Sequence, residues 1–139
     1  MKIDYQNKTK IRVRYGETDQ MGYCYYGNYA QYFEVGRVEA LRDIGMSYRE
    51  IEKQGIMLPV SEFHVKYKTP ALYDDELTII TKIVEVKGVR IGFDYQIINE
   101  SKKTVATAHT TLVFVDKKTM SPIIAPTIFL NLIKPFEIK

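Results

Sequence analysis

The sequence predicts an α+β domain in which one long helix is covered by a curved antiparallel sheet. Three observations lead to this fold class. The length of 139 residues suits one domain, a single long amphipathic segment lies near the start, and most of the remaining chain alternates apolar and polar residues. Short turns join the alternating segments, and they favour antiparallel neighbours because parallel neighbours need long crossovers. A helix and a sheet of this kind pack as layers around one core.

The composition places the chain among ordinary globular proteins. Hydrophobic residues make up 45% and charged residues 27% of the sequence, which suffices to close a core without disulfides or metal. No repeat or low-complexity linker divides the chain, so we expect a single domain over residues 1–139. The net charge of +3 is too small and too dispersed to indicate a nucleic-acid-binding protein.

The cysteine content and the N-terminal segment favour a cytoplasmic protein. Cys24 is the only cysteine, so no internal disulfide can form. The segment MKIDYQNKTKIRVRY is interrupted by charge throughout and contains neither a signal-peptide core nor a membrane-spanning stretch. We therefore expect a cytoplasmic location and no membrane span.

The first elements are a strand and a long helix. Residues 9–15 alternate between an apolar face and a cationic face, which is typical of a half-buried strand. From Asn28 the apolar residues recur at three-to-four spacing, with Asn28 as the expected N-cap and Gly45 placed to end the helix. Ser47 and Glu50 form a capping box that predicts a second, short helix.

Four long strands are expected after the short helix. Alternation of apolar and polar side chains defines them, at residues 61–69, 76–86, 89–99 and 104–116. A C-terminal piece near residues 126–133 is expected to add one or two helical turns. One helix cannot hide both faces of such a sheet, so an uncovered face or an edge strand is expected to meet a second copy. We therefore expect a homodimer or a homotetramer.

The segment RYGETDQMGYCYYGNY, which leads into the long helix, combines acidic residues, tyrosines, glycines and the one cysteine. Its pattern resembles the hot-dog acyl-CoA thioesterases of the 4-hydroxybenzoyl-CoA thioesterase type. The matching positions are Tyr15, Thr18, Asp19, Gly22, Tyr25, Tyr26, Asn28, Tyr29, Glu34 and Arg37. The segment PALYDDEL at 70–77 resembles the second landmark of that family, and the similarity extends over nearly the whole chain. The resemblance implies the hot-dog fold and a cofactor-free acyl-CoA or aroyl-CoA thioesterase, with its site at a subunit interface.

One position departs from many acyl-CoA members of that family. They carry histidine where this chain has Tyr26, within the run YYGNY. A histidine-based mechanism is therefore excluded at that position. The 4-hydroxybenzoyl branch itself resembles this chain in having tyrosine there, and it contributes the main-chain N–H.

Thioester hydrolysis needs a nucleophile or an activated water, and a group that stabilises the negative charge growing on the thioester oxygen. From spacing alone Asp19 is an ordinary turn residue, but the resemblance implies that it is the catalytic carboxylate. It can act as a nucleophile or as a general base, and the sequence leaves both open. The N–H of Tyr26 or Gly27, at the start of the helix, is the expected oxyanion donor. Glu17 falls outside the family pattern and is interpreted as a solvated loop residue.

Further residues are expected to bind the substrate. Aromatic side chains would build part of the acyl pocket, namely Tyr15, Tyr25, Tyr29 and Phe33. Tyr15 would do so from the end of the first strand. Asn28 is a candidate substrate contact, although capping explains it fully. The phosphates of CoA need cations, for which Lys66, Lys68 and Arg90 are candidates. Lysines on an edge strand also act against aggregation, which is an equal explanation.

We interpret the other side chains of potential chemical interest as structural. Cys24 is expected to be a small buried side chain, because no motif ties it to a histidine. His64 and His109 fall in strands and lack a third ligand, so no metal site is predicted. Glu34 and Arg37 lie three residues apart on the helix and are expected to pair.

Three alternatives to the acyl-CoA thioesterase stay open. The substrate of the same reaction could be an acyl carrier protein thioester, whose acidic protein would meet the cationic surface. The groove could hold an acyl-CoA without turning it over, but Asp19 beside a helix N-terminus argues against such a binding module. A tyrosine-rich nucleic-acid-binding domain has the aromatic residues but lacks a basic cluster.

Overall fold

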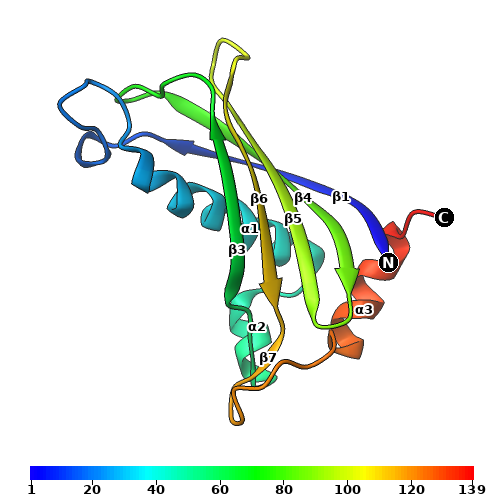
Figure 1. Ribbon diagram of the computed structural model, residues 1–139. Coiled ribbons are helices and arrows are strands. Elements are labelled where there is room, and N and C mark those ends of the chain that lie inside the picture. The colour runs from blue at the N-terminus through cyan, green and yellow to red at the C-terminus, as the bar shows by residue number, and fades with distance from the viewer.

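The computed structural model describes residues 1–139 and shows a long helix lying against one face of a curved five-stranded sheet (Figure 1). The strands are β1 (Lys2–Arg12), β3 (Val60–Tyr67), β4 (Glu76–Lys87), β5 (Arg90–Ile98) and β6 (Thr104–Val113). Their order in the sheet is β1-β4-β5-β6-β3, and every neighbouring pair is antiparallel. The expected α+β arrangement is therefore confirmed.

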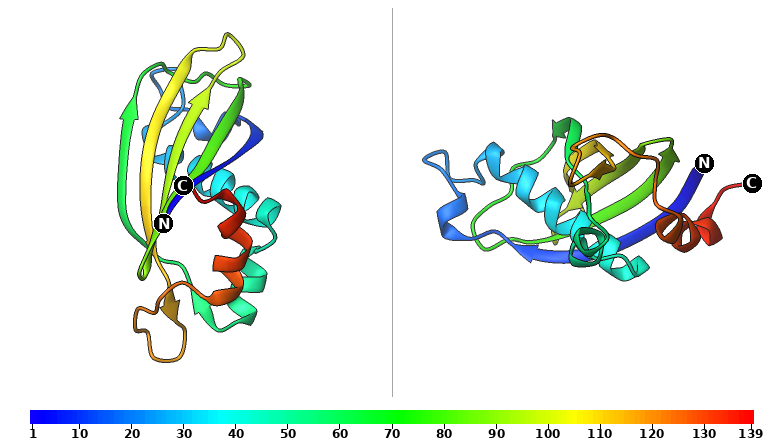
Figure 2. Two further views of the ribbon diagram at one scale, coloured as in Figure 1. Left: turned by 90° about the vertical axis from the view of Figure 1, so that its right-hand side faces the viewer. Right: turned by 90° about the horizontal axis from the view of Figure 1, so that it is seen from below.

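The helices begin and end where local signals place them. The α-helices are α1 (Tyr29–Ile44), α2 (Tyr48–Lys53) and α3 (Thr127–Ile133), and the short 3-10 helices are η1 (Tyr15–Glu17), η2 (Tyr26–Asn28) and η3 (Lys134–Phe136). Gly45 ends α1 with a φ of 105°, a left-handed conformation that glycine adopts without strain. The Ser47 side chain accepts a hydrogen bond from the Glu50 N–H and so caps α2. Figure 2 shows α1 and α3 on the same side of the sheet.

The core lies between α1 and the concave face of the sheet. Phe33 and Leu41 of α1 and Ile79 and Phe93 of the sheet are each 0–1% exposed, and burying an apolar side chain of this size contributes roughly 1.5–3 kcal/mol. Gly36 lets the helix come close, because a Cβ there would lie 2.4 Å from the Thr81 Oγ1 atom. This close approach fixes the middle of α1 against β4.

The strand boundaries differ from the sequence prediction at two places. The first strand was expected at 9–15 but runs from Lys2 to Arg12. Ile3 and Tyr5 are buried and alternate with exposed residues, so the half-buried strand begins earlier than predicted. The strand expected over 104–116 is interrupted at Phe114, whose ring is 1% exposed and packs on Phe129. After that break, β7 (Val115–Asp116) pairs with β2 (Ile56–Met57), which is too short for periodicity to predict.

The two edges of the sheet differ. The start of β1 is tied to the C-terminal segment, since the Ile138 N–H donates to the Lys2 carbonyl at 2.9 Å. Strand β3 has its other side open, and most of its residues are exposed. No helix has both the length and the apolar character that a membrane crossing requires.

Candidate active site

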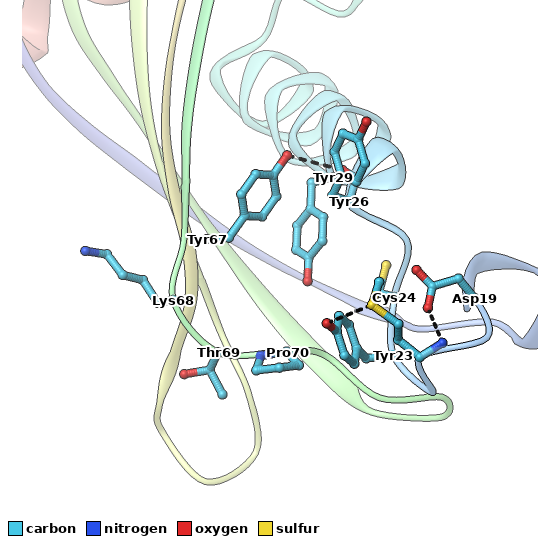
Figure 3. A pocket seen from close by; sticks show the side chains of 10 residues that line it. Asp19, Tyr23, Cys24, Tyr26, Tyr29, Tyr67, Lys68, Thr69 and Pro70 are labelled. Carbon is cyan, nitrogen blue, oxygen red and sulfur yellow. Dashed lines mark hydrogen bonds between the residues drawn. The ribbon is translucent and has the colours of Figure 1, made fainter.

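A pocket of about 320 Å³ lies where the loop before α1 meets the end of β3. Asp19 borders it from the loop, Tyr26 and Tyr29 from the start of the helix, and Tyr67 from β3 (Figure 3). Lys68, which follows β3 directly, completes this part of the wall. The sequence motif and the strand end are about forty residues apart in the chain, so only the tertiary fold brings them together.

Asp19 stands at the start of a tight turn. Its Oδ1 atom accepts a hydrogen bond from the Met21 N–H at 2.9 Å, and its backbone N–H donates to the Tyr23 carbonyl at 3.0 Å. These bonds are the turn chemistry expected from spacing alone. The Oδ2 atom makes no hydrogen bond within the chain, however, and Asp19 borders the pocket. The carboxylate is thus held by one oxygen while the other is available for a ligand.

The backbone N–H groups of Tyr26 and Gly27 lie at the start of η2, which continues directly into α1. Neither N–H donates a hydrogen bond within the chain, whereas the next two, of Asn28 and Tyr29, bond to the carbonyls of Tyr25 and Tyr26. Unbonded N–H groups at the start of a helix carry the positive end of its dipole. They are therefore able to stabilise a developing oxyanion beside Tyr26.

Gly27 also shapes the local backbone. A Cβ at this position would lie 2.5 Å from the Cε2 atom of the Tyr25 ring. Glycine therefore lets the Tyr25 ring fold back over η2, where it packs against the Tyr26 ring with centroids 4.8 Å apart. Tyr25 itself does not border the pocket, so its contribution is to support Tyr26.

Glu17 is buried, and its interpretation as a solvated loop residue was wrong. Its carboxylate accepts hydrogen bonds from the Arg14 N–H at 2.9 Å, from the Arg14 guanidinium at 2.8 and 3.0 Å, and from the Tyr32 hydroxyl at 2.8 Å. Burial acts to raise the pKa of this carboxyl, but the bonds from Arg14 and Tyr32 outweigh it and hold the pKa below its usual value. Glu17 is therefore a charged anchor between the loop and α1.

The backbone carbonyl of Glu17 makes two further links to the helix start. It accepts a hydrogen bond from the Tyr25 N–H and another from the Asn28 side-chain amide, both at 2.8 Å. Asn28 occupies the N-cap position of α1, as expected, but its side chain makes no capping bond and instead reaches back to Glu17. The segment carrying Asp19 and the segment carrying the free N–H groups are thus fastened to each other.

Three tyrosines from three elements form the aromatic wall of the pocket. The Tyr67 ring meets the Tyr29 ring at 5.2 Å and the Tyr26 ring at 6.2 Å, both edge to face. The Tyr67 hydroxyl donates to the Tyr26 carbonyl at 3.3 Å. Tyr29 is 3% exposed, and burial raises its pKa to about 12. Sequence reasoning missed Tyr67, although it shares the inward face of β3 with Phe63 and Val65.

Besides Tyr25, two more of the expected acyl-pocket residues do not border the pocket. Tyr15 was expected to end the first strand, but it lies in η1, is 77% exposed and packs on Tyr73. Phe33 is 1% exposed and packs in the core against Tyr95. The fold of one chain therefore brings neither ring to the pocket.

The three candidate cations are not brought together. Lys68 borders the pocket, but Lys66 lies on the face of the sheet away from α1, in a hollow with His64 and His109. Arg90 lies beside the β4–β5 turn, in a third hollow. The alternation of β3 places Lys66 opposite the inward-facing Tyr67, which explains the separation. Lys68 is the only one of the three at the pocket.

Cys24 borders the pocket that contains Asp19, whereas His64 and His109 border a different hollow. Cys24 is 2% exposed, as predicted, and burial raises the pKa of its thiol, which lies 3.3 Å from the Tyr32 hydroxyl. His109 bonds Asp94 through Nδ1 at 2.6 Å, on the outer face of the sheet. The structure contains no cluster of three or more side chains suited to hold a metal ion.

The expected pairing of Glu34 with Arg37 was wrong. The Arg37 side chain is 6% exposed, and it bonds the hydroxyl groups of Tyr48 and Tyr95. It points into the interior, whereas Glu34 is exposed on the helix surface.

Comparison with known proteins identifies the family. The family model of the Thioesterase-like superfamily matches residues 13–137. The putative acyl-CoA thioesterase YneP of Bacillus subtilis is 36% identical over 117 residues, which cover 84% of this chain and 85% of that protein. The acyl-CoA thioester hydrolase YbgC of Escherichia coli O6:H1 is 31% identical, over 81% of this chain and 84% of that one. A DHNA-CoA thioesterase structure from Staphylococcus aureus superposes with a TM-score of 0.83 at 37% identity, covering 86% of this chain and 80% of that chain.

The chain belongs to the Thioesterase-like superfamily. Its sheet wrapped around α1 is the hot-dog fold of solved thioesterases, as the motif predicted. The predicted class of enzyme, a thioester hydrolase, is confirmed with it.

The burial and charge of Glu17 predict how stability depends on pH. The pKa of Glu17 is lower in the folded than in the unfolded chain, so the unfolded state binds more protons as pH falls below the ordinary glutamate pKa of about 4.3. The contribution of Glu17 to the free energy of unfolding is therefore fully present above that pH. It is lost as the pH falls through the pKa of Glu17 in the folded chain. Urea unfolding between pH 6 and roughly 3 should show a shallower acid loss for Glu17→Gln than for the wild type. Glu50→Gln, at an exposed position, should match the wild-type slope, and equal slopes for all three proteins would contradict this role of Glu17.

Proposed function

We propose that this chain hydrolyses acyl-CoA thioesters to free acid and CoA in the pocket bordered by Asp19. One observation carries the proposal: the free Oδ2 atom of Asp19 and the unbonded N–H groups of Tyr26 and Gly27 belong to segments fastened together around one pocket. A carboxylate and oxyanion donors are the two groups that thioester hydrolysis requires. The relatives named above are described as a putative acyl-CoA thioesterase and an acyl-CoA thioester hydrolase, which supports CoA as the carrier of the acyl group.

The reaction can follow two routes from this geometry. In the first, the Asp19 carboxylate attacks the thioester carbonyl, the C–S bond breaks, and CoA leaves as a thiolate that takes a proton from water. Water then opens the aspartyl anhydride and regenerates the carboxylate. In the second, Asp19 accepts a proton from water as that water attacks, and returns it to the departing thiolate. Both routes place negative charge on the carbonyl oxygen, where the Tyr26 or Gly27 N–H stabilises it.

The remaining pocket residues would bind the two ends of the substrate. The aromatic wall of Tyr26, Tyr29 and Tyr67 offers apolar contact to the acyl group near the reacting carbonyl. Lys68 at the pocket offers a cation to the phosphates of CoA. Lys66 and Arg90 border other hollows and not this pocket of the same chain, although a second copy could bring their surfaces near it.

Replacement of Asp19 should abolish turnover while the fold remains. Asp19→Asn keeps the hydrogen bond from Met21 but removes the nucleophile or base, so kcat should fall by about 10²- to 10⁴-fold. Release of free thiol from a panel of acyl-CoAs and aroyl-CoAs measures this. Asp116→Asn is a matched control, because Asp116 accepts the same kind of turn bond from the Lys118 N–H at 2.8 Å but lies away from the pocket.

The same assay distinguishes the open alternatives. Turnover of an acyl carrier protein thioester but of no CoA thioester would transfer the proposal to the carrier protein. Tight binding of acyl-CoA without turnover in the wild type would establish the binding module. Turnover equal in Asp19→Asn and wild type would overturn the role of Asp19.

We further propose that the protein works as a homo-oligomer joined along β3. This strand is an open sheet edge with half-exposed apolar side chains, among them Val60 at 48% and Phe63 at 40% exposure. The Lys68 N–H donates to the Val105 carbonyl of β6. Because bonded and non-bonded pairs alternate along an antiparallel ladder, the Val65 N–H points away from β6, toward the open side.

Light scattering coupled to size-exclusion chromatography should therefore give two or four times the chain mass of 16.2 kDa. Val65→Pro removes an outward N–H that β6 does not use, so it should shift the population toward monomer. Val65→Thr keeps that N–H and should leave the assembly unchanged. A wild-type monomer at micromolar concentration would refute the proposal.

A further inference from the structure

A side chain of the sheet contacts the backbone at the start of the helix. The Tyr67 hydroxyl, at the end of β3, donates a hydrogen bond to the Tyr26 carbonyl at 3.3 Å (Figure 3). The two rings also meet edge to face, with their centroids 6.2 Å apart. The reaction steps described for Asp19 give this hydrogen bond no role.

The Tyr26 carbonyl and the Gly27 N–H belong to the same peptide group. This group is planar and trans, so its C=O and its N–H point in opposite directions. At the start of a helix the carbonyl points into the helix along its axis, whereas the N–H points out of the N-terminus. A donor on the Tyr26 carbonyl therefore leaves the Gly27 N–H free to meet a ligand.

A hydrogen bond at the carbonyl of a peptide group strengthens its N–H as a donor. Linked hydrogen bonds polarise one another, by roughly 10–30% per bond in condensed phases. The Tyr26 carbonyl accepts a bond from the Tyr29 N–H as well as the one from Tyr67. Both bonds draw electron density toward the carbonyl oxygen, which makes the Gly27 N–H a better donor to an oxyanion.

The neighbouring peptide group has no hydroxyl donor. The Tyr25 carbonyl shares its peptide group with the Tyr26 N–H, and it accepts a bond from the Asn28 N–H at 3.0 Å. It also accepts one from the Cys24 thiol at 3.6 Å, but a thiol is a weak donor. Of the two unbonded N–H groups, that of Gly27 is therefore the more strongly polarised.

The Tyr67 hydroxyl is suited to this role because it stays protonated. Burial, and after it the neighbouring Tyr26, raises the pKa of Tyr67 above that of an ordinary tyrosine. The hydroxyl is consequently a donor throughout the neutral pH range. The Tyr67 side chain is also 48% exposed, so small changes to its ring leave the core intact.

We propose that Tyr67 is a positioning residue for thioester hydrolysis, whose hydroxyl fixes and polarises the Tyr26–Gly27 peptide group so that the Gly27 N–H stabilises the oxyanion more strongly. Tyr67 acts through the backbone and does not touch the reacting atoms. This role rests on the proposed function, because it concerns the oxyanion of that reaction. It extends the oxyanion site from the helix start to the end of β3.

Single-turnover hydrolysis tests this role, because it isolates the chemical step. Tyr67→Phe removes the hydroxyl and keeps the ring, whereas replacement of Tyr67 by 3-fluorotyrosine makes the hydroxyl a stronger donor. The maximal rate should fall about threefold to tenfold in Tyr67→Phe, a part of the roughly 10²- to 10³-fold cost of losing an oxyanion donor. It should rise above the wild-type rate with 3-fluorotyrosine. The half-saturating concentration should change less than about twofold in both proteins.

The amide nitrogen of Gly27 reports the same link without turnover. In ¹⁵N-labelled protein its chemical shift responds to hydrogen bonds at the preceding carbonyl. The shift should move one way in Tyr67→Phe and the other way with 3-fluorotyrosine. Tyr73→Phe is a matched control, because Tyr73 is 58% exposed and does not border the pocket. It should leave both the rate and the Gly27 shift unchanged.

Three results would overturn the proposal. The first is an equal maximal rate in the wild type, Tyr67→Phe and the 3-fluorotyrosine protein. The second is a higher half-saturating concentration at an unchanged maximal rate, which would make Tyr67 a direct substrate contact. The third is a Gly27 shift that is indifferent to both replacements. A wild type that hydrolyses no thioester would instead refute the proposed function, and the Gly27 shift would still decide whether Tyr67 polarises the peptide group.

Discussion

The burial of the Glu17 carboxylate is the constraint on which the candidate site depends. Its ion pair with Arg14 ties it to the segment that follows β1. The hydrogen bond that it accepts from Tyr32 ties it to α1. The carbonyl of the same residue holds Tyr25 and Asn28 at the helix start. Asp19 follows Glu17 by two residues and Tyr26 follows Tyr25 by one, so these bonds set the carboxylate and the N–H groups relative to each other. A buried carboxylate accepting several donors is rigid, because loss of any donor leaves a costly unpaired group.

The sheet and helix provide the frame for this loop. Gly36 permits α1 to approach Thr81 of β4 closely, and the packed interior on either side leaves the helix little freedom to shift. The N-terminus of α1 is consequently fixed beside the end of β3, where Tyr67 and Lys68 complete the pocket. The loop that carries Asp19 is therefore held between two rigid elements, which is the arrangement that preorganised charge stabilisation requires.

Local signals in the sequence were sufficient for most elements of the fold. Gly45 ended α1, Ser47 began α2, and alternation located β4, β5 and β6, because each of these signals acts within a few residues. The short strand β2 was missed, since two residues carry no period, and β7 was expected as the end of one strand over 104–116 and not as a separate strand.

The site was predicted less completely, because its geometry comes from contacts distant in sequence. The motif located Asp19 and Tyr26, and the structure puts both at one pocket. The burial of Glu17 depends on Tyr32, fifteen residues away, which no local pattern reports; the spacing of Arg14 and Glu17 was the one available hint. Arg37 was read as a surface partner of Glu34, because helical spacing shows which residues share a face but not that the face is buried.

The central claim is that the N–H groups beside Tyr26 polarise the thioester carbonyl, and that Glu17 holds them in place. Isotope-edited infrared spectroscopy measures this directly, with a thioester carrying a ¹³C-labelled carbonyl bound to the inactive Asp19→Asn protein. The account predicts a carbonyl stretch at lower frequency than that of the same thioester in water, and a smaller shift when Glu17→Gln is added. A bound carbonyl at the frequency seen in water, or one indifferent to Glu17, would contradict it.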